Sequence, residues 1–94
     1  MNAIFQQISE QDISSVLELM REFYQQQHMR FDEVVAANAV TKLLADPSRG
    51  QICFIYRGSE LAGYFVVTIC VSLEFHDNFA LLDELYVREA FRGR

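Results

Sequence analysis

Residues 80–94, with the sequence ALLDELYVREAFRGR, carry the most informative pattern in the chain. The first part, residues 80–87, is mostly apolar and predicts a β-strand. Two adjacent carboxylates, Asp83 and Glu84, interrupt this strand. Successive side chains of a strand point to opposite faces, so we expect only one of the two carboxylates to face a cleft. The segment after the strand contains arginines at 88, 92 and 94.

The residues before this stretch predict a hairpin and a long strand. Residues 51–56 are rich in β-forming side chains, and RGSE at 57–60 is typical of a hairpin turn. Residues 61–73 are apolar at almost every position, which predicts a strand covered on both faces. Gly63 within it indicates a bulge or a close approach of another backbone. Residues 74–78 are polar and predict a loop before the last strand.

The N-terminal half has the spacing of helices. A short apolar run at 3–8 predicts a first strand, and Ser9 followed by Asp12 predicts a capped helix start. Apolar residues recur every three or four positions from Ile13 to Tyr24, which predicts an amphipathic helix. A second helix is expected to begin near Phe31 and Asp32 and to end in the segment 46–50, which contains proline and glycine.

The predicted order is therefore strand, helix, helix, strand, strand, strand. This order indicates an α/β (α+β) chain in which two helices pack against a mainly antiparallel sheet. The length of 94 residues fits one domain over residues 1–94 or a piece of a larger one.

Composition and charge exclude several classes of function. The chain is 51% hydrophobic and carries a net charge of −5, which argues against binding nucleic acid or an anionic membrane. No apolar stretch approaches the ~20 residues of a membrane helix. Cys53 and Cys70 lie in apolar runs without metal-binding spacing, so we expect reduced thiols, a cytoplasmic location and no metal site. His28 and His76 have no ligand-like partners and are expected at the surface.

Residues 80–94 resemble the fourth strand and the start of the cofactor loop in the GNAT superfamily of acyl-CoA-dependent N-acetyltransferases. In that family, a strand ending in an aromatic residue and valine leads through a turn into the motif Q/R-x-x-G-x-G/A. Tyr86 and Val87 match the strand end, and Arg92, Gly93 and Arg94 match the first three motif positions. The motif glycines would follow Arg94, so the resemblance implies the N-terminal half of a GNAT domain, truncated within the loop.

The resemblance implies transfer of an acetyl group from acetyl-CoA to a primary amine. The backbone of Leu85, Tyr86 and Val87 would pair with the pantetheine arm. Residues 92–94 would belong to the loop that holds the pyrophosphate, where backbone N–H groups bind anions. Without the family pattern, Arg92 and Arg94 would be interpreted as a solvated basic tail.

The general base implied by the reaction is Glu84, with Asp83 as the second candidate. Strict alternation along the strand places Leu81, Leu85 and Val87 on the face of Asp83. It places Leu82 and Tyr86 on the face of Glu84. The alternative interpretation of the two carboxylates is a pair of charges that protects an edge strand from aggregation.

Two functions follow from these features. The first is an N-acetyltransferase acting on a small amine, favoured by the acidic net charge and expected to be weak or inactive as this chain alone. The second is a non-catalytic interaction module derived from a truncated GNAT domain. An uncovered sheet face and an unpaired edge strand would also favour a homo-oligomer, most simply a dimer.

Overall fold

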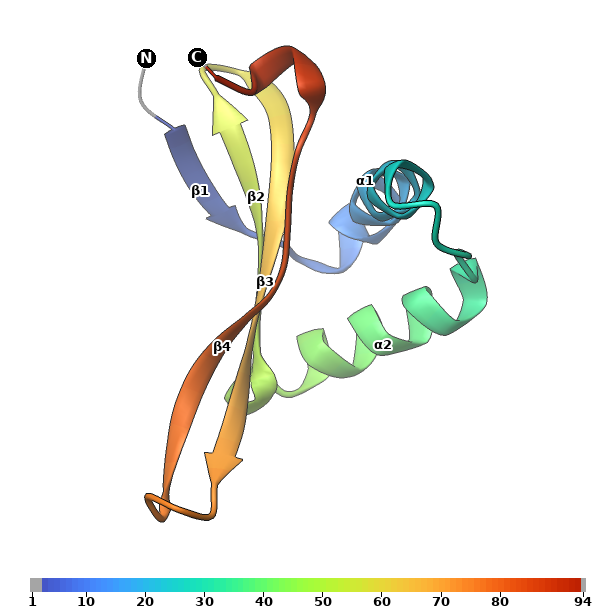
Figure 1. Ribbon diagram of the computed structural model, residues 1–94. Helices are drawn as coiled ribbons and strands as arrows, with labels where there is room; N and C mark the ends of the chain where they lie inside the picture. Colours follow the sequence, from blue (N-terminus) through green and yellow to red (C-terminus); the bar gives the residue numbers. More distant parts are fainter. Residues whose placement is uncertain (1–2, 94) are drawn as a thin grey trace.

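Two helices and four strands form the chain in the order predicted from its sequence (Figure 1). The computed structural model describes residues 3–93. The elements are β1 (Ala3–Gln7), α1 (Ile13–Gln26), α2 (Glu33–Ala45), β2 (Gly50–Arg57), β3 (Glu60–Ser72) and β4 (Asp77–Val87). Single 3-10 turns, η1 (Glu10–Asp12), η2 (Pro47–Arg49) and η3 (Glu89–Phe91), flank them. The α+β class and the element order are confirmed.

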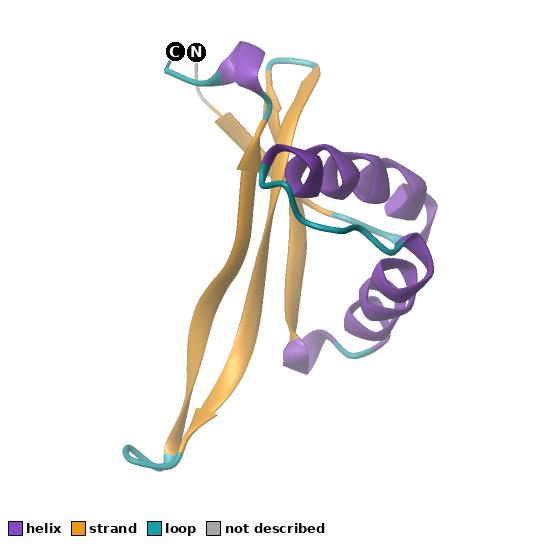
Figure 2. Ribbon diagram, turned by 45° about the vertical axis from the view of Figure 1, so that its right-hand side comes forward, coloured by secondary structure: helices purple, strands orange, loops and turns teal. Residues whose placement is uncertain are grey.

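The four strands form one sheet with the spatial order β1-β2-β3-β4, and every neighbouring pair is antiparallel. Both helices lie on the same side of this sheet, which we call the helix face (Figure 2). The hairpin β3–β4 extends well past the helices. The prediction that 61–73 is covered on both faces is therefore wrong for the described residues: Val71, for example, is 70% exposed.

The hydrophobic core lies between the helices and the helix face. Val16 and Leu19 of α1 and Val40 of α2 are almost fully buried there. The sheet contributes its inward-facing residues, which are Ile52, Phe54, Tyr64, Val66 and Tyr86. Every second side chain of a strand points to the helices, and the apolar side chains of each helix recur about every 3.6 residues on the side that packs against the sheet.

Local hydrogen bonds fix the helix ends where the sequence predicts them. The carboxylate of Asp12 accepts bonds from the backbone N–H of Ser9 at 2.9 Å and from its hydroxyl at 3.2 Å. Asp32 accepts from the backbone N–H of Val35 at 3.1 Å and so caps α2, which begins at Glu33. None of the helices within residues 3–93 is both long and apolar enough to cross a membrane.

The last strand begins earlier than predicted. Residues 77–79 were expected in or beside a loop, yet Ser72 pairs with Asp77 and β4 runs on from there. This part of the hairpin lies beyond the helices, so polar side chains on the ladder remain solvated and do not end the strand. The turn between β2 and β3 is confirmed, with Gly58 in the left-handed region at φ 63°.

Two irregularities shape the sheet near the end of β4. A Cβ added at Gly63 would lie 2.0 Å from the carbonyl oxygen of Tyr86, which confirms a close backbone approach. The register of β3 against β4 shifts between Val66 and Val67. Val66 pairs with Glu84 and Val67 with Leu82, which leaves Asp83 as the extra residue of a β-bulge.

Candidate active site between the helices and strand β4

The bulge at Asp83 changes which side chains share a face of β4. Directly opposite residues of an antiparallel pair lie on the same face. Leu81 lies opposite Thr68, and Glu84 lies opposite Val66, so both belong to the helix face. Leu82 and Leu85 lie opposite Val67 and Phe65 on the other side, which we call the far face. The predicted grouping of Leu82 with Glu84, and of Leu81 with Leu85, is therefore wrong because the extra residue reverses the alternation.

Both carboxylates line one pocket of about 470 Å³ between the helices and the sheet. The expectation that only one of them faces a cleft is wrong for the same reason, since a bulge turns two successive residues towards one side. Apolar side chains form most of the pocket, including Met20, Phe31, Val35, Val40, Ile52 and Val66. The volume and the mainly apolar lining are typical of a site for a small molecule.

Two tyrosines hold the carboxylate of Glu84. The hydroxyl of Tyr24 on α1 donates to one carboxylate oxygen at 2.8 Å, and that of Tyr64 on β3 donates to the other at 2.7 Å. Burial and the neighbouring Glu84 raise the pKa of Tyr24 to about 12. The same two causes raise the pKa of Tyr64 above its ordinary value. Both hydroxyls therefore stay protonated at neutral pH and act as donors.

This arrangement leaves Glu84 able to accept another hydrogen bond. Each carboxylate oxygen has two lone-pair sites, and each tyrosine uses one. A cationic or neutral amine in the pocket can therefore reach a fixed acceptor. Asp83 is exposed at the pocket edge and adds a second negative charge.

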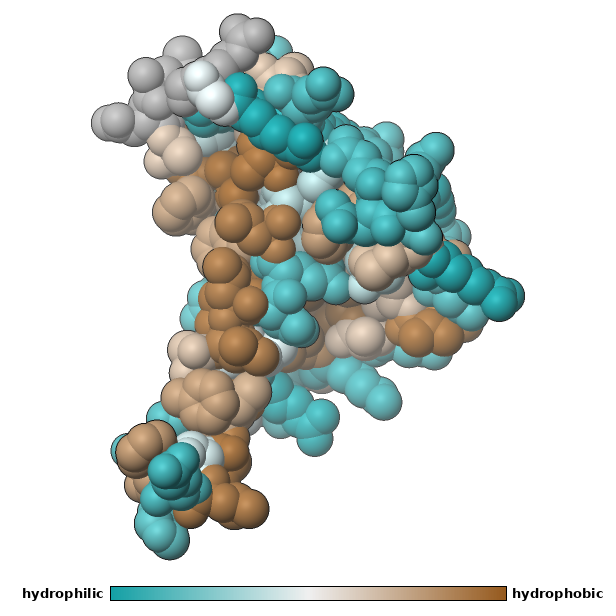
Figure 3. Space-filling view, viewed as in Figure 1, coloured by the Kyte–Doolittle hydropathy of each residue, from teal (hydrophilic) through white to brown (hydrophobic). Residues whose placement is uncertain are grey.

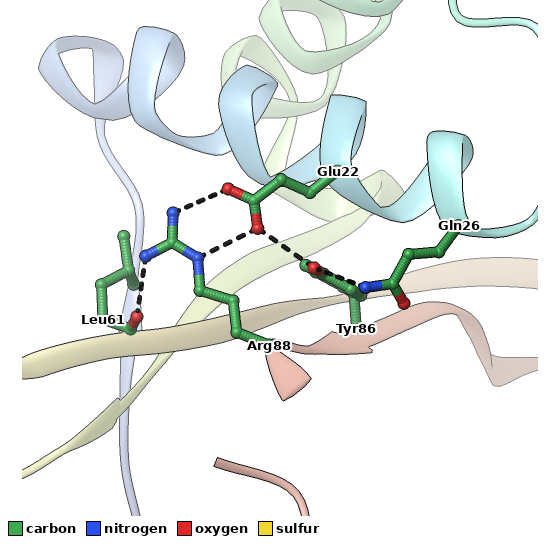
Figure 4. A network of polar contacts seen from close by, with 5 residues as sticks. All are labelled: Glu22, Gln26, Leu61, Tyr86 and Arg88. Atoms are coloured by element: carbon green, nitrogen blue, oxygen red, sulfur yellow. Dashed lines mark hydrogen bonds and ion pairs between the residues drawn. The ribbon is translucent and has the colours of Figure 1, made fainter. Parts of the chain in front are cut away.

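A second polar network fastens α1 to the end of β4 (Figure 4). Arg88 donates to both carboxylate oxygens of Glu22, at 3.0 Å and 2.9 Å. The hydroxyl of Tyr86 donates to Glu22 at 3.0 Å. The hydrogen bond from Arg88 is the main reason why the pKa of Glu22 is lowered. Arg88 also donates to the carbonyl of Leu61 at 3.2 Å, so the network joins α1, β3 and β4.

The residues expected to meet the cofactor lie at the end of β4. The side chain of Tyr86 is buried on the helix face, while Leu85 is 52% exposed on the far face. β4 is an edge of the sheet, so in the described chain its outer backbone groups have no strand partner. A strand-like ligand arm could pair with this edge.

Arg92 is folded back onto the sheet. Its Nε donates to the carbonyl of Val87, and its Nη2 donates to the side chain of Gln26, both at 2.6 Å. Its guanidinium also lies over the ring of Tyr86. Gly93 has φ 71°, a conformation that favours glycine. Arg94 lies outside the described residues.

The sequence alone did not identify the tyrosine partners of Glu84. The sequence predicts Tyr24 only as the end of the apolar helix stripe and Tyr64 only as part of the strand 61–73. Their meeting requires the register of β3 against β4 and the position of the bulge, and neither pattern is visible in a single sequence. The sequence pattern that bears on this contact is the apolar helix stripe that ends at Tyr24, which places Tyr24 on the side of the helix that faces the sheet.

Comparisons with known proteins give the fold. No protein-family model matches the chain, and no curated protein matches it. An integron cassette protein, HFX_CASS3, from the mobile metagenome of Cole Harbour Salt Marsh is similar in structure, with 31% identity and a TM-score of 0.88. The alignment covers 96% of this chain and 59% of that protein, so the chain spans less than two thirds of its relative.

Two further structures are described as acetyltransferases. A possible acetyltransferase from Clostridium difficile 630 aligns over 100% of this chain and 62% of its own, with 16% identity and a TM-score of 0.82. A GNAT family acetyltransferase from Staphylococcus aureus aligns over 100% and 68%, with 12% identity and a TM-score of 0.73. The chain therefore has a GNAT-like fold, as residues 80–94 indicated.

Proposed function

We propose that this chain forms the acceptor side of an N-acetyltransferase that moves an acetyl group from acetyl-CoA to a primary amine. The observation that carries the proposal is the pocket between the helices and β4. Glu84 and Asp83 reach into a mainly apolar space, and two tyrosine hydroxyls hold Glu84. The acetyltransferases among the proteins of similar fold support the same class of reaction.

Glu84 would act as the general base. A substrate ammonium gives one proton to Glu84, directly or through water, and becomes a neutral nucleophile. Its nitrogen then bonds to the thioester carbonyl carbon, and the carbon–sulfur bond breaks. One of the two protons left on nitrogen passes to the leaving thiolate, and the other stays on the amide nitrogen. The products are the amide and CoA, and Glu84 returns its proton to solvent.

The free edge of β4 fits the strand-like pantetheine arm of acetyl-CoA. Backbone groups of Leu85 would bind it. The carbonyl of Tyr86 points to Gly63 on β3 and so away from this edge, and the carbonyl of Val87 becomes available only when Arg92 releases it. Gly93 and Arg92 are suited to the start of an anion-binding loop, because a left-handed glycine lets successive N–H groups converge.

Amine binding and acetyl transfer should be measured separately. Binding of n-hexylamine can be followed by NMR, and transfer by thiol release from acetyl-CoA. Glu84→Gln should weaken binding of the cation and lower transfer by about a hundredfold, the usual size of a lost general base. Asp83→Asn should have a smaller effect, and Asp77→Asn, far out on the hairpin, should have none. Unchanged binding and transfer in Glu84→Gln would contradict the role of Glu84.

Exposed apolar residues favour a second candidate function, self-association. Phe5, Leu82 and Leu85 are between 52% and 62% exposed on the far face. Hydrophobic surface also runs along the β3–β4 edge to the hairpin tip (Figure 3). A second copy could cover this surface and pair with the free edge of β4 around a two-fold axis. Sedimentation velocity over a range of concentrations tests this, and a monomer at every concentration would exclude it.

A further inference from the structure

The charges around the pocket are separated, and this separation bears on the acceptor. Glu84 and Asp83 lie on β4 at one side. Lys42, from the last turn of α2, and Arg49, from the turn before β2, line the pocket as well. A pocket that only needed to hold a simple amine would gain nothing from cations, which repel it.

The sheet sets the distance between the two charged sides. Gly50, next to Arg49, pairs with Thr68 on β3, and Val66 on β3 pairs with Glu84. The backbones at Arg49 and Glu84 are therefore two strand spacings apart, or about 10 Å, before any offset along the strands. Ile52 and Val66 provide an apolar floor between them.

The two cations differ in what already binds them. Arg49 forms an ion pair with Asp46 at 3.3 Å and remains 68% exposed in its side chain. Lys42 forms no ion pair with any residue of the range 3–93. An anionic group entering the pocket would meet the ammonium of Lys42 first and could share the guanidinium of Arg49 with Asp46.

We propose that the acceptor is a zwitterion, in which an apolar stretch of several carbons separates a primary amine from a carboxylate. This rests on the function proposed above, because the amine must lie at Glu84 and Asp83. The carboxylate lies at Lys42 and Arg49, and the apolar stretch packs on Ile52 and Val66. An ω-amino acid, or a short peptide with its free amine at one end, has this chemistry.

Arg30 and Asp32 also line the pocket, from the loop between the helices. They carry opposite charges two positions apart, and Asp32 caps α2. Their charges therefore offset each other, and the pocket remains acidic at β4 and basic at Lys42 and Arg49.

Three small probes test the proposal on the chain without any need for turnover. They are ε-aminocaproate, which has both charges, n-hexylamine, which has only the amine, and hexanoate, which has only the carboxylate. We expect ε-aminocaproate to bind about five- to tenfold more tightly than n-hexylamine, the gain from one charge-assisted contact. Hexanoate should bind more weakly than either, because Glu84 and Asp83 repel it.

Variants test whether Lys42 and Arg49 bind the carboxylate of ε-aminocaproate. In the double variant Lys42→Gln with Arg49→Gln, the advantage of ε-aminocaproate over n-hexylamine should disappear, while the affinity for n-hexylamine stays equal or improves. Lys42→Glu should bind ε-aminocaproate more weakly than n-hexylamine. Arg21→Gln is the matched control, because Arg21 pairs with Glu33 outside the pocket, and it should keep the advantage. Circular dichroism verifies that each variant is folded.

The possible results separate the two proposals. Equal binding of ε-aminocaproate and n-hexylamine to the parent chain would overturn the zwitterion proposal. The proposed amine site would still stand in that case if Glu84→Gln loses the binding of n-hexylamine. An advantage that survives the double glutamine variant would also overturn the zwitterion proposal. If n-hexylamine does not bind, or binds equally to Glu84→Gln, the amine site is wrong and the zwitterion falls with it.

Discussion

Tyr24 and Tyr64 reach Glu84 from two different elements, the helix α1 and the strand β3. Within residues 3–93, these two hydroxyls are the only groups that donate hydrogen bonds to the Glu84 carboxylate. A carboxylate with both oxygens bonded has few rotamers left, so the position of Glu84 is fixed before any substrate arrives. Fixed acceptors of this kind need no reorganisation during a reaction.

Removing the hydroxyl of Tyr24 should show how much stability comes from its hydrogen bond to Glu84. We call the two tyrosine hydrogen bonds to Glu84 the clamp. Tyr24→Phe should lower the free energy of unfolding at neutral pH by about 1 kcal/mol, the value of one hydrogen bond. The pKa of Tyr24 is raised from 10.0 to about 12, so its protonated form contributes stability fully below pH 10, and this is lost as pH rises to 12. Denaturant unfolding across this range should show a shallower decline in Tyr24→Phe.

Tyr56→Phe is the control for this experiment, because Tyr56 lies on β2 outside the pocket. It should leave the alkaline decline unchanged. Some decline should persist in Tyr24→Phe, because the pKa of Tyr64 is also raised. A parent chain whose stability does not fall between pH 10 and 12 would contradict the clamp.

Gly63 allows β3 and β4 to approach each other beside Tyr86. A methyl group there would meet the Tyr86 carbonyl oxygen at 2.0 Å and the Cα of Val87 at 2.9 Å, and both are backbone atoms that cannot rotate away. Gly63→Ala should therefore destabilise the fold by about 3 kcal/mol, the upper range for overpacking. Gly93→Ala, with open space around its Cβ, should cost only about 1–2 kcal/mol of left-handed strain. Thermal unfolding distinguishes the two, and equal losses would contradict the steric argument.

At the scale of elements, α1 and β4 are joined by the ion pair between Glu22 and Arg88. Both side chains are about one-third exposed, so we expect a coupling energy of about 1 kcal/mol from a double-mutant cycle with Glu22→Gln and Arg88→Gln. The lowered pKa of Glu22 means that this contribution is complete above its ordinary pKa of 4.5 and is lost as pH falls through the lowered value. The coupling should therefore vanish in strong acid, and a coupling that persists there would exclude an ionic origin.

The elements themselves could largely be predicted from the sequence, because each has a local signal. The helix stripe after Ile13, the Asp12 and Asp32 caps and the Gly58 turn all depend on residues a few positions apart. The β-bulge at Asp83 has no such signal, since it depends on how β3 and β4 pair. It decides which carboxylates enter the pocket, so strict alternation could rank Glu84 first but could not place Asp83 beside it.

Across the whole molecule, the two faces of the sheet differ in what covers them. The helix face holds the core and the pocket, while the far face is bare in the described part of the chain. The resemblance in residues 80–94 indicated the fold, and the structural similarity agrees with it. The set of charges that lines the pocket could not be predicted from sequence, because Lys42, Arg49 and Glu84 border one pocket only when three strands and a helix are assembled.

The bare far face predicts self-association that a single charge should disrupt. Leu82 is 56% exposed on this face, so Leu82→Glu should leave the fold intact but place a charge within an apolar contact. We expect the dimer dissociation constant from sedimentation equilibrium to rise by about tenfold or more, which corresponds to a loss of at least 1.4 kcal/mol. Val34→Glu is the matched control, because Val34 is 70% exposed on α2, on the other side of the sheet. If both variants weaken association equally, the copies do not meet through the far face, and a charge effect common to the whole acidic chain explains the result.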